Sequence, residues 1–108
     1  MIFNRTTNQS FNIKIEYADT FFKRFIGLMG KKNINFALLF SNLKDSSIHT
    51  MFMRENIDVY FLDKNNMVFD KTSLSPWKFY KPEKQAEYIL ETKKDLLKIK
   101  IGDNLDFI

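Results

Sequence analysis

The strongest constraint on the fold is a series of short apolar runs, each followed by polar or turn-forming residues. Residues 36–40 and 57–62 are the clearest of these runs. Runs of this length suit strands, whereas a helix in a globular protein usually needs about ten residues or more. Residues 11–17 alternate apolar and polar side chains, the pattern of a half-buried strand. The remaining expected strands are residues 48–53, 67–69, 86–91, 99–101 and 105–108.

Seven or eight short strands in 108 residues predict a mainly β fold. We expect a β-sandwich, a jelly-roll-like fold or a partly closed barrel with mostly antiparallel strands. The length suits one domain over residues 1–108. Residues 63–66 favour a hairpin turn, because asparagine tolerates left-handed backbone. Residues 71–85 hold both prolines and are expected to form a surface loop.

Two segments depart from the strand pattern. Apolar residues at helical spacing follow Asp19 and Thr20, either of which can cap a first turn, and Gly27 is suited to end it. Residues 92–95 resemble a capping box. We therefore expect one or two short helices, near 20–27 and 93–98.

The net charge of +4 is concentrated in the first half of the chain. Residues 1–54 carry eight Lys and Arg against three Asp and Glu, which raises the question of nucleic-acid binding. Fourteen of the seventeen basic residues are Lys, however, whereas Arg is the usual residue for bidentate phosphate recognition. We do not expect a nucleic acid to be the partner.

Several classes of site lack the residues they need. With no cysteine and one histidine, the chain offers neither a disulfide nor a thiolate or His-rich metal site. Glycine-rich phosphate-binding motifs are absent too. No stretch approaches the roughly 20 apolar residues of a membrane span, and no apolar run of signal-peptide length is visible. We expect a cytoplasmic protein with no metal, no cofactor and no membrane association.

The polar residues that most resemble a site lie between residues 48 and 62. His49 could donate or accept a proton at a pocket mouth, with Arg54 as an anion clamp and Asp58 as an orienting group. The alternative is structural, and we favour it. In that interpretation Arg54 and Asp58 pair to fix a turn, while His49 bonds to the backbone.

Five sequence blocks together resemble the prokaryotic family known as domain of unknown function 192. They are ADTFFKRFIGLMG (18–30), HTMFMRENIDVYFLD (49–63), LSPWKFY (74–80), AEYILE (86–91) and IGDNLDFI (101–108). The resemblance runs from about residue 11 to the end and implies a β-sandwich or jelly-roll-like barrel with one or two short helices. It implies no reaction. The family usually has proline where this chain has Asn56, and proline would stiffen the reversal between Arg54 and Asp58.

The candidate pocket residues are His49, Thr50, Met53, Arg54, Asp58, Trp77 and Glu91. Two of them have structural alternatives. Trp77 could cover one end of the barrel instead of lining a cleft. Glu91 could cap the following helix or balance a lysine. No residue is assigned as catalytic.

Three kinds of function stay open. A module that binds a small molecule or a peptide is the first, since β folds of this kind often hold ligands at a barrel mouth or a sheet face. The second is a hydrolase-like or other enzyme that uses His49 with Asp58 or Glu91 as general acid or base. A structural or protein-partner module that exposes a sheet edge or the 71–85 loop is the third. We favour the binding module and expect no enzymatic activity.

Overall fold

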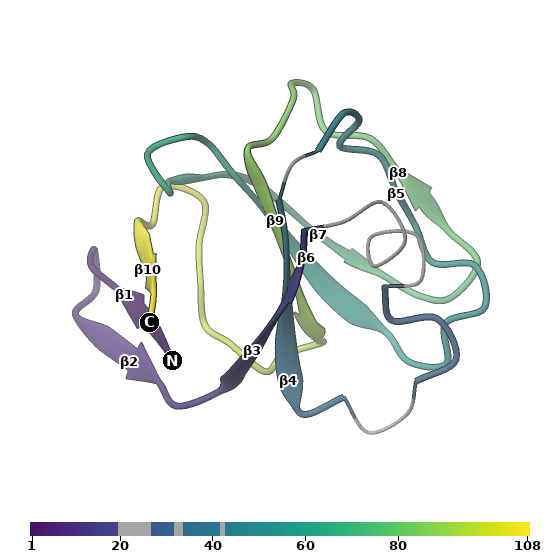
Figure 1. The fold of residues 1–108 in the computed structure, drawn as a ribbon, viewed down its shortest axis with the longest axis horizontal. Helices are drawn as coiled ribbons and strands as arrows, with labels where there is room; N and C mark the ends of the chain where they lie inside the picture. The colour runs from purple at the N-terminus through teal and green to yellow at the C-terminus, as the bar shows by residue number, and fades with distance from the viewer. Residues whose placement is uncertain (20–26, 32–33, 42) are drawn as a thin grey trace.

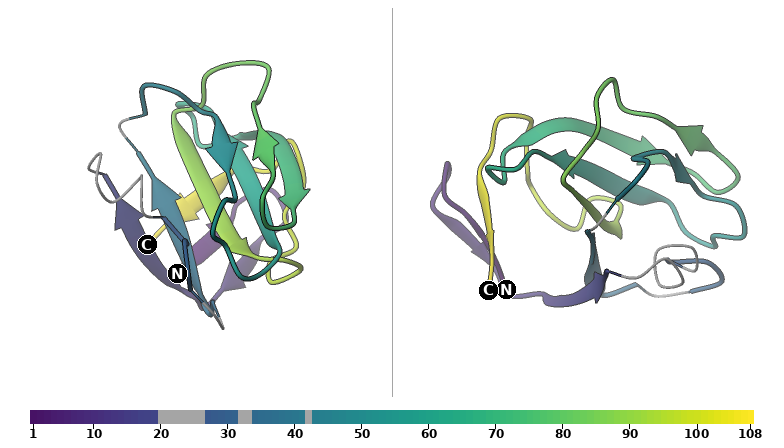
Figure 2. Two further views of the ribbon diagram at one scale, coloured as in Figure 1. Left: turned by 90° about the vertical axis from the view of Figure 1, so that its right-hand side faces the viewer. Right: turned by 45° about the horizontal axis from the view of Figure 1, so that its top comes forward.

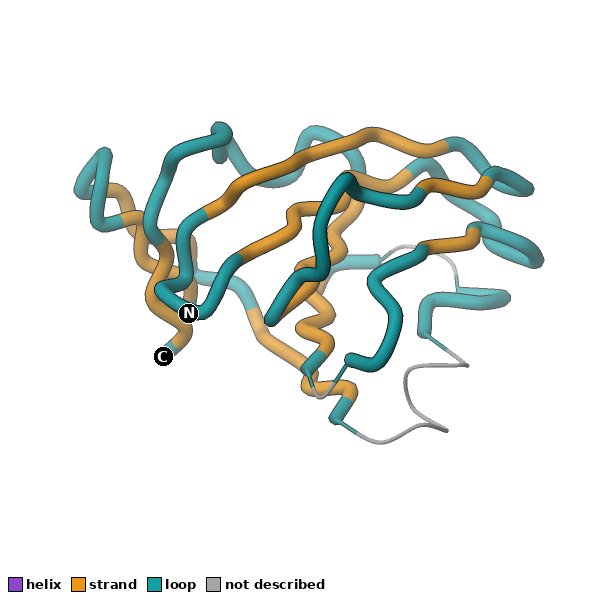
Figure 3. The backbone as a smooth tube through the Cα atoms, turned by 90° about the horizontal axis from the view of Figure 1, so that it is seen from above, coloured by secondary structure: helices purple, strands orange, loops and turns teal. Residues whose placement is uncertain are grey.

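The structure is a computed structural model that describes residues 1–19, 27–31, 34–41 and 43–108. Every regular element in these residues is a strand, which confirms the mainly β prediction. The strands form three sheets of five, three and two strands and do not close into one barrel. Figure 3 shows strands and loops alone in the described part of the chain. No helix in that part is long and apolar enough to cross a membrane.

The central sheet has the order β3-β4-β9-β6-β7 (Figure 1). These strands are β3 (Lys14–Ala18), β4 (Phe36–Phe40), β9 (Tyr88–Lys93), β6 (Ile57–Leu62) and β7 (Val68–Leu74). The β3–β4 pair is parallel, and the other neighbours are antiparallel. All six residues of β6 are buried, because both faces of the sheet are covered. A strand covered on both faces reads as a nearly continuous apolar run, which is the pattern seen in its sequence.

One face of the central sheet packs against the strands formed by the two ends of the chain. Those strands are β1 (Ile2–Asn4), β2 (Gln9–Phe11) and β10 (Leu105–Phe107), and they form a sheet of order β10-β1-β2. Leu39, Tyr60 and Leu90 from the central sheet share one apolar cluster with Ile2 and Leu105. Figure 2 shows the purple and yellow strands together at one end of the molecule, beside both termini.

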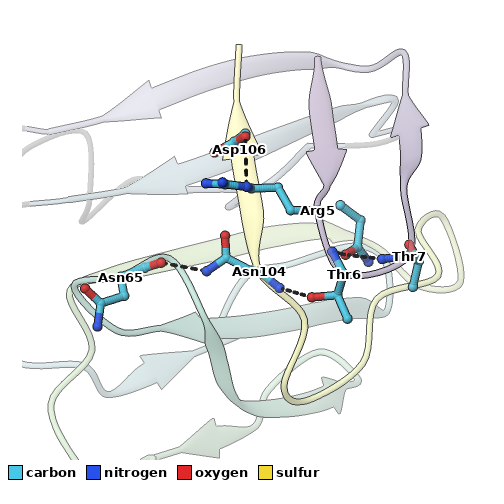
Figure 4. A network of polar contacts seen from close by, with 7 residues as sticks. Arg5, Thr6, Thr7, Asn65, Asn104 and Asp106 are labelled. Atoms are coloured by element: carbon cyan, nitrogen blue, oxygen red, sulfur yellow. Dashed lines mark hydrogen bonds and ion pairs between the residues drawn. The ribbon is translucent and has the colours of Figure 1, made fainter.

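Polar contacts also join the two ends of the chain. Buried Asn4 donates from Nδ2 to Asp103 Oδ2 at 2.8 Å. Nearby, the Asn104 backbone N–H donates to Thr6 Oγ1 at 2.9 Å, and Asn104 Nδ2 donates to the Asn65 carbonyl at 2.8 Å (Figure 4). The three-stranded sheet β10-β1-β2 is thereby fixed to the β6–β7 turn by hydrogen bonds as well as by apolar packing.

The opposite face of the central sheet carries the second apolar cluster. Leu38, Val59, Phe61 and Ile89 belong to it, together with Leu28. A two-stranded sheet of β5 (Ile48–His49) and β8 (Phe79–Tyr80) lies near this cluster, to which Ile48 and Tyr80 contribute. This face holds the candidate site.

Two strands were predicted with the observed bounds, Phe36–Phe40 and Ile57–Leu62. The strand expected at 48–53 ends at His49, because the chain turns where the Met53 N–H donates to the Thr50 carbonyl and Phe52 takes a positive φ of 63°. The expected strand at 99–101 is replaced by a turn in which the Asp103 N–H donates to the Lys100 carbonyl.

The expectation of a surface loop over 71–85 was wrong at two places. β7 continues to Leu74, and β8 forms at Phe79–Tyr80. The prolines lie outside both strands, so neither interrupts a ladder.

The helix expected near 93–98 was wrong. β9 continues to Lys93, which pairs with Ile57, and the chain then turns, with the Leu96 N–H donating to the Lys93 carbonyl. Asp95 has a φ of 63°, which an α-helix does not allow. Thr92 is buried in the sheet and does not cap a helix. The other expected helix, near 20–27, lies outside the described residues except for Gly27, which is in a turn.

Candidate ligand-binding cavity

A cavity of about 530 Å³ lies beside the second apolar cluster. Its wall includes Phe40, Ile89 and Glu91 from the central sheet, and His49 from β5. Lys44 and Asp45 also line it and are exposed, so the cavity reaches the surface beside them. A volume of roughly 300–1,000 Å³ is typical of small-molecule sites. The cavity is therefore large enough for a small organic ligand.

Glu91 is the most unusual residue of this wall. It lies in the middle of β9, opposite Leu38 on one neighbouring strand and Val59 on the other. Residues directly opposite one another share a face of a sheet, so its side chain lies between these two apolar ones. Only 4% of the residue is exposed. Burial raises the pKa of its carboxyl group to about 8, because the carboxylate form loses its hydration.

The Glu91 carboxyl group has no hydrogen bond or ion pair with another residue in the described part of the chain. A buried carboxyl without a partner is destabilising, and most buried polar groups are hydrogen-bonded. The carboxyl group is thus available to a molecule in the cavity.

His49 contributes a second unpartnered polar atom. It pairs with Phe79 across the β5–β8 ladder and is half-buried. Its Nδ1 atom is buried and has no hydrogen-bond partner among the residues that the structure describes. A neutral imidazole can accept a hydrogen bond at one ring nitrogen and donate one at the other. His49 can therefore bond to a donor or to an acceptor group of a ligand.

Three of the seven predicted pocket residues share this cavity: His49, Met53 and Glu91. Thr50 is next to them in sequence but faces the neighbouring loop. Its hydroxyl donates to the Ser75 carbonyl at 2.7 Å and accepts from the Lys78 N–H at 2.7 Å. Thr50 therefore holds the 75–78 segment in place.

Asp58 does not line the cavity. Side chains alternate between the faces of a strand, so Asp58 points to the face opposite that of Val59 and Glu91. Its carboxylate accepts from Ser73 Oγ, and from the Asp95 N–H at 2.9 Å. Asp58 thus anchors the turn that follows β9.

Arg54 and Trp77 are both exposed. Arg54 lies in a separate depression with Lys93 and Lys94, and no ion pair joins it to Asp58 among the residues that the structure places. Trp77 is 61% exposed and makes an edge-to-face contact with Phe52, with ring centroids 4.8 Å apart. Trp77 therefore neither covers the core nor lines the cavity.

The chain matches the sequence model of the family described as "Uncharacterized ACR", domain of unknown function 192, over residues 2–107. It belongs to this family. Curated relatives include a UPF0127 protein of Thermococcus sibiricus, 42% identical over 99% of this chain and 74% of the relative. A UPF0127 protein of Pyrococcus furiosus is 40% identical over 96% of this chain and 95% of the relative. None of these names states an activity.

Two crystal structures share the fold of this member of the domain of unknown function 192 family. One, from Sinorhizobium meliloti 1021, has a TM-score of 0.85 at 16% identity and covers 97% of this chain and 88% of its own. It is titled as a suggested transcription regulator. A protein of unknown function from Novosphingobium aromaticivorans has a TM-score of 0.77 at 18% identity, covering 88% of this chain and 75% of its own. Sequence identities this low show a shared fold and say nothing about a shared function.

Several wall residues of this family member were missed as site residues. Phe40 and Ile89 were recognised only as parts of predicted strands. Lys44 and Asp45 lie in a polar stretch between two predicted strands. That position in a loop was the one feature of the sequence that could have indicated them as site residues. Among the described residues, no three His, Asp or Glu side chains lie close enough together to hold a metal ion.

Proposed function

We propose that this protein is a binding module for a small, largely apolar molecule that carries one polar group. The observation that carries the proposal is Glu91, a buried carboxyl without a partner among the described residues, in the wall of a cavity of about 530 Å³. The polar group of the ligand would bond to Glu91 and to His49, while its body packs against apolar residues such as Phe40 and Ile89.

The stability balance supports this proposal. An unpaired buried polar group typically destabilises a protein by about 1–3 kcal/mol, and an apolar residue at position 91 would avoid that loss. Proteins commonly lose stability at positions that serve a function. Glutamate between Leu38 and Val59 is therefore better explained by a ligand than by packing.

The pKa of Glu91 favours acid–base catalysis as a second candidate. A carboxyl group with a pKa raised to about 8 holds its proton at neutral pH and can act as a general acid. His49 in the same wall could then serve as the base. Of the two acidic residues considered as its partner, Glu91 shares this cavity and Asp58 does not. In this case a bound molecule would be converted during prolonged incubation, and Glu91→Gln would retain binding but stop the conversion.

We also include a cytoplasmic location in the proposal, because a chain without cysteine has no need of an oxidising compartment.

A backbone amide NMR titration with small aromatic molecules tests the binding proposal. Indole and benzamide are suitable probes. We expect concentration-dependent shifts at residues 48, 49, 53, 89 and 91, and none in the distant strands β1 and β10. Met29→Trp, which places a large ring at the cavity wall, should abolish the shifts, and Glu87→Gln, a change at an exposed acid, should not. Shifts that persist unchanged in Met29→Trp would contradict the proposal.

A further inference from the structure

On the premise that the cavity is a ligand site, we propose that its ligand is an organic cation, an ammonium or amidinium group on an apolar body, whose charged end lies against Glu91. The evidence is the distribution of charge in the cavity wall. Four of the described wall residues are titratable: Lys44, Asp45, His49 and Glu91. They differ in how deeply they are buried.

Lys44 and Asp45 are exposed and carry opposite charges, so these two described residues together add no net charge to the cavity wall. Asp45 already accepts from the Ser47 N–H at 2.8 Å. Glu91 is therefore the one buried acid among the described wall residues. A ligand carboxylate would place a second acid beside it, whereas a cation would supply the missing counter-charge.

The other wall residues suit a cation as well. Phe40 presents an aromatic side chain, and aromatic rings attract cations. Met29 and Met53 add polarisable sulfur atoms. The strands facing Glu91 place only Leu38 and Val59 directly opposite it, so neither brings a positive charge that would compete with the ligand.

His49 supplies a second acceptor. An ammonium or amidinium group carries several N–H donors, so one such group can bond to the Glu91 carboxylate and to the unpartnered Nδ1 of a neutral His49. A hydroxyl has one donor and satisfies one of the two acceptors. The wall thus favours a nitrogen cation over an alcohol.

Binding of a cation is coupled to release of a proton. The free protein holds a proton on Glu91 at neutral pH, because burial raises the pKa of this group to about 8. When the cation binds, the O–H bond of the Glu91 carboxyl breaks, the proton goes to solvent, and an ion pair forms. The affinity for a permanent cation should therefore rise by up to about tenfold for each pH unit below pH 8, and then level off.

Benzamidine, benzamide and benzoate test the inference, since they share one shape and carry charges of +1, 0 and −1. Dissociation constants are measured by amide NMR titration between pH 7 and pH 8.5. We expect benzamidine to bind at least about tenfold more tightly than benzamide at pH 8, with an affinity that rises with pH. Glu91→Gln should remove both the preference and the pH dependence, and Glu87→Gln should keep them.

The outcomes separate the ligand class from the proposed function. If benzamide binds as tightly as benzamidine, or benzoate binds most tightly, the cavity is a ligand site but the cationic class is wrong. If none of the three shifts any amide of the cavity wall up to the solubility limit, the proposed function fails and this inference fails with it. A benzamidine affinity that does not change with pH also overturns the inference.

Discussion

Glu91 of β9 and His49 of β5 lie in the wall of one cavity, although they belong to different sheets. Each presents a polar group without a hydrogen-bond partner in the described part of the chain. Two such groups in one wall reduce the stability of the folded state, and a ligand that bonds to both would restore it. Because burial also raises the pKa of Glu91, the free energy of unfolding should depend on the pH at which this carboxyl group loses its proton.

The first prediction concerns that pH dependence. The pKa of Glu91 is about 8 in the folded protein and near 4.5 in the unfolded chain, so between these values the folded state binds the proton more tightly. The stabilisation is complete below pH 4.5 and is lost as the pH rises to 8. At about 1.4 kcal/mol per pKa unit, the complete loss is on the order of 5 kcal/mol.

Urea unfolding of the wild type and Glu91→Gln at several pH values measures this effect. The difference in unfolding free energy between the two proteins should shift in favour of Glu91→Gln from pH 5 to pH 8. Glu87→Gln serves as the control and should follow the wild type. Parallel curves for the wild type and Glu91→Gln would show that Glu91 titrates normally.

The second prediction concerns Asp58. Its carboxylate accepts from Ser73 Oγ and from the Asp95 N–H, so Asp58→Ala leaves both donors unpaired and should destabilise the protein by about 2–3 kcal/mol. Ser73→Ala removes one partner and should lose about 1 kcal/mol. Chemical unfolding measures both. Benzamidine should bind Asp58→Ala as it binds the wild type, and loss of that binding would place Asp58 in the site.

The third prediction concerns Thr50, whose hydroxyl bonds to Ser75 and Lys78. Thr50→Val keeps the shape but removes both hydrogen bonds, and we expect a loss of about 2 kcal/mol. Thr50→Ser keeps the hydroxyl and should lose less than about 1 kcal/mol. Urea unfolding followed by the fluorescence of Trp77, the one tryptophan, reports both variants. Equal losses in the two variants would show that the hydroxyl contributes nothing.

The fourth prediction concerns the backbone at Trp77, which has a φ of 64°. A left-handed conformation costs an L-residue about 1–2 kcal/mol, and glycine avoids this cost. Trp77→Gly should therefore be more stable than Trp77→Ala by about 1 kcal/mol in unfolding monitored by circular dichroism. Since both variants lose the contact with Phe52, their difference isolates the backbone. A more stable alanine variant would contradict the assigned turn.

The strands buried on both faces were the easiest part of the fold to predict. β4 is a continuous apolar run and β6 is one interrupted only by Asp58, and their observed bounds match the predicted ones. The helix near 93–98 failed because a tertiary contact overrides its local capping pattern. Asp58, far away in sequence, accepts from the Asp95 N–H and fixes the turn. Sequence periodicity holds no information about such a contact.

The candidate site was only partly predictable for a related reason. Glu91 and Asp58 are both acids in buried strands, and the sequence alone did not distinguish them. The β6–β9 register does, because it places Glu91 opposite Val59, whereas Asp58 lies on the other face. Met53 reaches the cavity through the turn at Phe52, which the expected straight strand did not include.

The most direct measurement is a carbon-detected NMR titration of the Glu91 side-chain carboxyl, with and without benzamidine. In the free protein the buried Glu91 carboxyl group has no counter-charge and should titrate near pH 8. With benzamidine bound, its midpoint should fall to a lower pH. A midpoint near 4.5 in the free protein, or one that benzamidine leaves unchanged, would contradict the account.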